Sequence, residues 1–162
     1  MAEPSYPIKE QIVQAIVTAL EAISLENGYH TDVSSVVRPR RTGENFAPAD
    51  KGVAVLQDAE YREEDADLCG NPPAIGWRLP ISCDLVVRHS EHDETPMDQV
   101  LNTFESDVSK CLMADPTWGG LAIDTELGRT EYPAPSAGVE GLTQWVEVIY
   151  RVDEDDPYVN RA

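Results

Sequence analysis

Residues 75–88 alternate between apolar and mostly polar or small side chains, and this pattern constrains the fold more than any other. Apolar residues occupy every second position: Ile75, Trp77, Leu79, Ile81, Cys83, Leu85 and Val87. Only a period of two explains such a run, which predicts a β-strand with one buried face. The segment is long for a strand, and Pro80 cannot donate a ladder hydrogen bond. We therefore expect a bulge or an edge position at Pro80.

Two amphipathic helices are predicted, one before and one after this strand. The first, at about 7–26, repeats apolar residues at spacings of three and four. The second follows Thr95-Pro96 and runs from Met97 to Leu112. One core is expected to unite the strand with both helices, and it should contain Leu79, Ile81, Cys83, Leu85, Ile12, Ile16, Leu20, Leu101, Phe104 and Val108.

Shorter alternating runs predict further strands at 29–38, 53–57, 121–127 and 142–152. The resulting order, α-β-β-β-α-β-β, indicates an α+β fold. In this fold a mostly antiparallel sheet of about five strands carries both helices on one face. We interpret the chain as a single domain, 1–162, with loop insertions near 38–52 and 58–74. An acidic, extended C-terminal tail is expected at 153–162.

The balance of charge disfavours several classes of partner. The chain has 12 Lys and Arg against 30 Asp and Glu, a formal net charge of −18. Nucleic acid and anionic membrane surfaces repel such a protein. No segment reaches the roughly 20 apolar residues that span a bilayer. With 41% hydrophobic residues the chain is too apolar for a disordered acidic tail, so a folded protein without a membrane partner is expected.

The sequence contains no pattern typical of an active site or a metal centre. The run around His89 and His92 does not match a helical zinc-binding spacing, so a loop with solvated charges is favoured. His30 has no acid or nucleophile beside it in the sequence. The three cysteines form no CxxC pair, and no nucleophile elbow or phosphate-binding loop is present. We therefore expect no enzyme activity, no cofactor and no bound metal.

Two features predict contacts between subunits. The strand 142–152 carries bulky groups on both faces, because Trp145 and Ile149 lie opposite its other apolar residues. Such a strand is either covered on both faces or part of an interface. Arg38, Arg40 and Arg41 form a basic cluster in a loop that contains Pro and Gly. We predict that this loop docks on an acidic face of a neighbouring subunit, with contacts inside its own subunit or with solvent as an equal alternative.

The order of elements and several short sequence segments resemble those of tail terminator (tail completion) proteins of long-tailed bacteriophages. The resemblance spans nearly all 162 residues and includes the opening helix, the strand 75–88 and the helix 97–112. The short segments on which the resemblance rests are Leu25-Glu26-Asn27-Gly28-Tyr29, Asp115-Pro116-Thr117-Trp118-Gly119-Gly120-Leu121-Ala122, Val148-Ile149-Tyr150-Arg151 and Asp156-Pro157-Tyr158. The acidic insertion at 58–74 departs from the family pattern.

The resemblance implies a subunit of a hexameric ring at the head-proximal end of the phage tail tube. Such a ring ends tube polymerisation and joins the tail to the head connector, in the virion and, during assembly, in the host cytoplasm. The implied partners are further copies of the chain, the tail tube protein and the connector or neck protein, while viral DNA passes through the lumen without specific binding. Subunit contacts are expected at Arg38, Arg40, Arg41, Trp145, Ile149 and Tyr158. Two alternatives stay open: another connector, neck or minor tail protein, and a small α+β enzyme or ligand-binding domain.

Overall fold

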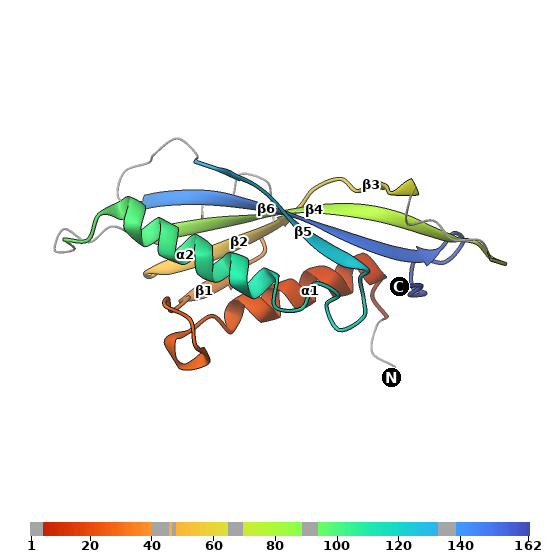
Figure 1. Cartoon of the computed structure of the whole chain (residues 1–162), viewed down its shortest axis with the longest axis horizontal. Helices are drawn as coiled ribbons and strands as arrows, with labels where there is room; N and C mark the ends of the chain where they lie inside the picture. The colour runs from red at the N-terminus through yellow and green to blue at the C-terminus, as the bar shows by residue number, and fades with distance from the viewer. Residues whose placement is uncertain (1–4, 40–45, 47, 65–69, 89–93, 133–138) are drawn as a thin grey trace.

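The fold is one long twisted sheet that carries both helices on a single face (Figure 1). The computed structural model describes residues 5–39, 46, 48–64, 70–88, 94–132 and 139–162. Helix α1 spans Ile8–Glu21, a 3₁₀ turn spans Leu25–Asn27, and helix α2 spans Met97–Leu112. No helix in this part of the chain is long and apolar enough to cross a membrane.

The sheet formed by the described residues has six strands and is mixed, but mostly antiparallel. In chain order the strands are β1 Ser35–Val37, β2 Lys51–Gln57, β3 Tyr61–Arg62, β4 Ala74–Arg88, β5 Asp124–Glu131 and β6 Val139–Asp153. The main path is β1-β2-β4-β6-β5, and β3 pairs with β4 off this path. Strands β1 and β2 are parallel, whereas the other pairs are antiparallel. The α+β class and the mostly antiparallel sheet are confirmed; the expected number and order of strands differ in detail.

The differences from the predicted elements fall where the hydrophobic pattern is weakest. The strand expected at 29–38 is reduced to three residues, and the insertion at 58–74, expected to be a loop, contains β3. The strand expected at 121–127 begins at Asp124 and continues to Glu131, with a register shift between Leu127 and Thr130. These short or irregular pairings depend on the strand beside them more than on their own alternation.

Pro80 lies within β4 without interrupting its pairing to β6, so the expected bulge is wrong. The register runs without a shift from Ala74↔Asp153 to Arg88↔Val139. A strand residue directs its N and its carbonyl to the same side, and the Pro80 carbonyl accepts a hydrogen bond from Asp58 N at 2.9 Å. The Pro80 nitrogen, which has no N–H to donate, points toward the side of β4 where β2 lies. Because β2 ends at Gln57, no residue of β2 needs a hydrogen bond from Pro80. The alternative expectation, a locally edge-like position, describes it correctly.

The C-terminal segment folds back on the domain and is not an extended tail. Pro157 O accepts a hydrogen bond from Ile8 N, at the start of α1, over 3.1 Å. The Asn160 side chain donates to Gly120 O over 2.8 Å, and Arg161 forms an ion pair with Asp153. These contacts connect the chain end to α1, to the turn after α2 and to β6.

The core between the sheet and the helices contains all ten residues that were predicted for it. Odd-numbered residues of β4 and even-numbered residues of β6 face the helices, because the register pairs Leu79 with Val148 and Ile81 with Val146. Burial raises the pKa of the Cys83 thiol to about 12, so this cysteine behaves as a small apolar core residue.

We predict that Phe104→Ala lowers the free energy of unfolding by about 3–5 kcal/mol, because the ring is fully buried and its loss leaves a cavity. Urea unfolding followed by circular dichroism measures the change. The matched control is Asn102→Ala on the exposed side of the same helix, which should change stability by no more than about 0.5 kcal/mol. Similar small effects of both substitutions would show that α2 packs with another face.

Candidate functional site

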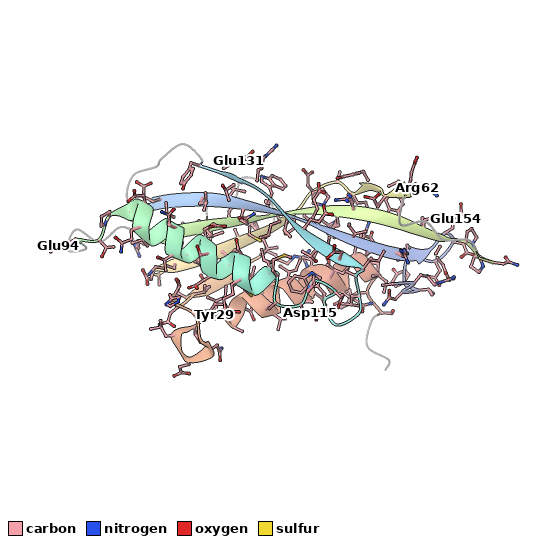
Figure 2. The ribbon with its side chains drawn as sticks, viewed as in Figure 1. Tyr29, Arg62, Glu94, Asp115, Glu131 and Glu154 are labelled. Atoms are coloured by element: carbon pink, nitrogen blue, oxygen red, sulfur yellow. The ribbon has the colours of Figure 1, made fainter. Side chains whose placement is uncertain are left out.

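The face of the sheet opposite the helices, here called the open face, has no described helix over it (Figure 1). It is formed by the even-numbered residues of β4 and the odd-numbered residues of β6, which the register brings together. In Figure 2, the labelled Glu131 side chain lies at the end of β5 that is farther from α1. Half of these positions of β4 and β6 carry polar or charged residues, and no described helix covers them, so this face is a candidate surface for a partner.

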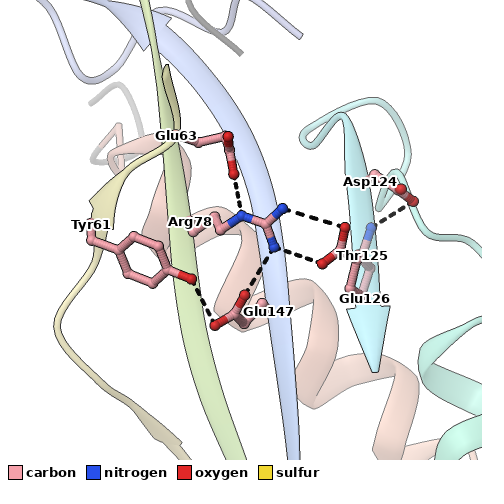
Figure 3. A network of polar contacts seen from close by, with 7 residues as sticks. All are labelled: Tyr61, Glu63, Arg78, Asp124, Thr125, Glu126 and Glu147. Carbon is pink, nitrogen blue, oxygen red and sulfur yellow. Dashed lines mark hydrogen bonds and ion pairs between the residues drawn. The ribbon is translucent and has the colours of Figure 1, made fainter. Parts of the chain in front are cut away.

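One arginine organises the centre of the open face (Figure 3). Arg78 Nη1 donates to Glu126 Oε2 at 2.6 Å and to Glu147 Oε2 at 3.0 Å, and its Nε donates to Glu63. The hydroxyl of Tyr61 donates to the other Glu147 oxygen at 2.9 Å. We call these five residues the Arg78 cluster. It joins β3 and the residue after it to β4, β6 and the edge strand β5.

The cluster has more negative than positive charge. One guanidinium faces three carboxylates, which leaves a formal charge of −2. The hydrogen bonds that Arg78 donates to Glu126 and Glu63 raise the pKa of Arg78, and the hydrogen bond from Arg78 lowers the pKa of Glu126. Burial, followed by the hydrogen bond to Glu147, raises the pKa of Tyr61. The cluster is therefore an acidic network on a sheet surface, in which the contact with Arg78 favours the ionised form of Glu126.

A hollow of about 390 Å³ adjoins the cluster and exposes Trp145. Its lining consists of Asp58, Pro80, Gly128, Arg129, Trp145 and Glu147. The Arg129 guanidinium lies over the Trp145 ring, 5.9 Å from its centroid, and the indole N–H donates to Glu131 at 3.3 Å. A Cβ at residue 128 would come within 3.1 Å of the Trp145 backbone carbonyl oxygen, so glycine there lets β5 lie close to this residue. The hollow thus combines an aromatic wall with a charged rim.

The segment that carries β3 is also held from the helix side. The Tyr150 hydroxyl, on the buried face of β6, donates to Glu60, and Glu60 pairs with Lys9 of α1 at 2.9 Å. Burial and the hydrogen bond to Glu60 raise the pKa of Tyr150. Glu60 and Glu63 therefore fix the two sides of one short segment, which places Glu63 beside Arg78.

The structure separates the residues that were predicted to form the subunit interface. Arg38 makes a two-pronged contact with Glu10 of α1, at 2.5 and 3.2 Å, so it pairs within its own subunit. Trp145 is partly buried on the open face, and Ile149, on the same face, is only 9% exposed. Tyr158 is 49% exposed in the C-terminal segment, close in sequence to the contact with α1.

The other predicted interface residues, Arg40 and Arg41, lie outside the described residues. The same holds for His89 and His92, the histidines considered for a metal. Among the residues that the structure does describe, no three His, Cys, Asp or Glu side chains are grouped so that they could hold a metal ion. A smaller hollow of about 160 Å³ beside the start of α2 includes His30, Lys51 and Gln99 in its lining.

Sequence reasoning missed the Arg78 cluster. Its signal was an arginine on the polar side of the alternating run 75–88, where a charged side chain must either reach solvent or find carboxylates. The carboxylates come from three separate segments, in a chain with 30 acidic residues, so sequence gave no reason to choose Glu63, Glu126 and Glu147. Only strand pairing brings them together.

We predict that Arg78→Gln lowers the free energy of unfolding by about 1–3 kcal/mol at pH 7, because three carboxylates lose their shared donor. The pKa of Glu126 is lower in the folded state than in the unfolded state, so its carboxylate stabilises the fold at pH values above the unfolded pKa. This stabilisation is lost as the pH falls through the folded pKa. The difference between wild type and variant should therefore shrink between about pH 5 and pH 3. Urea unfolding at both pH values provides the measurement.

Arg88→Gln, at the exposed end of the same strand, is the control and should change stability by no more than about 0.5 kcal/mol at either pH. A loss for Arg78→Gln that stayed constant with pH would mean that the network does not form in solution.

The comparisons with known proteins provide no family for this chain. No protein-family model matches the sequence, and no curated protein sequence matches it. The function is therefore inferred from the surface described above and from the resemblance to tail terminator proteins in the order of elements and in short sequence segments.

Proposed function

We propose that this chain is a structural subunit that assembles into a ring at the head-proximal end of a bacteriophage tail tube. The ring ends tube polymerisation and joins the tail to the head connector, as the resemblance to tail terminator proteins implies. One observation carries the proposal: the sheet has helices on one face and an open face, bearing Trp145 and the acidic Arg78 cluster, that no described helix covers. A subunit that uses its sheet as a contact surface has this division of faces.

The net charge of the chain supports the same role. A formal net charge of −18 per chain gives a ring whose walls repel the DNA backbone. DNA could then pass through the lumen without specific binding, because no counterion release would favour attachment. The proposal places the protein in the virion, with assembly in the host cytoplasm, and involves no cofactor and no catalytic step.

A ring has a direct signature in solution. We predict that the purified chain gives a light-scattering mass that is a multiple of the 17.9 kDa of one chain, six times that value for the expected hexamer. Negative-stain images should show particles with a central hole. Raised salt should weaken assembly if opposite charges make the contacts. A monomer at all protein concentrations, both alone and with tail tube subunits, would contradict the proposal.

The role in the tail has a separate signature. When added to polymerising tail tube subunits, the chain should bind at one end of each tube and shorten the length distribution. Rings that leave tube length unchanged but bind the connector would favour the alternative of another neck protein. A monomer that binds a small molecule in the hollow beside Trp145 would favour the ligand-binding alternative.

A further inference from the structure

The Arg78 cluster can accept another cation. The Glu126 side chain is 50% exposed and that of Glu147 is 32% exposed, so both carboxylates remain accessible although they already contact Arg78. Asp58, on the rim of the adjoining hollow, adds a further negative charge. The lowered pKa of Glu126 keeps it ionised, so the surplus of negative charge persists at neutral pH.

The hollow beside the cluster suits a guanidinium group in particular. Arginine stacks on aromatic rings and pairs with carboxylates through two parallel hydrogen bonds, which lysine cannot do. The hollow offers both elements, with Trp145 and Pro80 as apolar walls and Asp58 and Glu147 as acceptors. Arg129 lies over the Trp145 ring and also lines the hollow, so with Asp58 and Glu147 the lining carries a formal charge of −1.

The chain itself contains a segment with the required chemistry. Arg40 and Arg41 are the only two adjacent cationic residues in the sequence. Several other cations already contact a carboxylate within the chain; these are Lys9, Arg38, Lys51, Arg78, Arg129 and Arg161. The Arg40-Arg41 pair is the most concentrated positive charge in the sequence.

The described residues on either side of this pair lie at one edge of the sheet. Arg38 follows β1 and binds Glu10. Phe46 lies against β2, because a Cβ at Gly52 would come within 2.6 Å of its ring. The strand path β1-β2-β4-β6-β5 puts this edge opposite β5, which carries Glu126. Complementary charges at opposite edges are what a head-to-tail contact between copies requires.

We propose that the Arg78 cluster and the adjoining hollow receive the Arg40-Arg41 segment of a second copy of this chain. The inference rests on the proposed function and identifies the surface that joins neighbouring subunits of the ring. It assigns one arginine to the hollow between Trp145 and Asp58 and the other to Glu126 and Glu147.

Charge reversal tests the contact from both sides. Arg40→Glu/Arg41→Glu should raise the protein concentration needed for half-assembly by about tenfold or more, and Glu126→Lys should do the same. A variant that combines these three substitutions with Asp58→Lys should restore assembly at least in part, because the charges are then exchanged across the interface. Glu21→Lys, the same charge change on an exposed residue of α1, is the matched control and should leave assembly unchanged.

Circular dichroism first establishes that each variant is folded. If Glu126→Lys unfolds β5, Asp58→Lys alone takes its place, because Asp58 follows β2 and does not belong to the Arg78 cluster. Failure of the combined reversal to restore any assembly would count against direct pairing of these groups.

Cross-linking identifies the occupant. A photo-reactive benzoylphenylalanine at position 145, in a mixture of ¹⁴N- and ¹⁵N-labelled chains, should link to the peptide that contains residues 39–50 of a differently labelled copy. Links only within one copy, or between copies but to another peptide, would overturn the inference and leave the proposed ring intact. A wild-type chain that is monomeric under all conditions would overturn both.

Discussion

The pairing of β4 with β6 is the constraint on which the other parts of the structure depend. Fifteen residues of each strand pair without a shift, from Ala74↔Asp153 to Arg88↔Val139. Since side chains alternate between faces, this register puts the apolar residues of both strands under the same two helices. The length of β4 also lets β2 and β3 use successive parts of its other edge, with Pro80 close to the point where β2 ends.

The same register determines the chemistry of the open face. It places Glu147 diagonally across from Arg78, and β5 then brings Glu126 to the same guanidinium. The edge strand is thus attached by side-chain ion pairs as well as by its ladder. The cation is shared by three carboxylates, so the Arg78 cluster keeps a formal charge of −2. The groups that stabilise the subunit are therefore the same groups that we propose to receive a basic partner.

The structure changes the interpretation of the basic cluster that the sequence indicated. Arg38 binds Glu10, whose pKa is lowered by this hydrogen bond, so Arg38 contributes to the attachment of β1 to α1. Arg38 thus has a carboxylate partner within its own subunit, while Arg40 and Arg41 remain candidates for a contact between copies. Ile149, expected as an apolar contact, is almost fully covered within its own chain. Trp145 is the largest apolar side chain of this face that remains partly accessible among the described residues.

The sequence alone determined the two helices, the long strand 75–88 and the residues of the core. The spacing of apolar residues within each segment shows which face will be buried, and burial of these side chains stabilises the fold whichever element covers them. It did not determine β3, the length of β1, the parallel pairing of β1 with β2 or the folded-back C-terminal segment. Those features depend on backbone partners far along the chain, and their own residues alternate weakly. The Arg78 cluster likewise needed the tertiary structure, because a carboxylate has no preferred cation until strand pairing brings one within hydrogen-bonding distance.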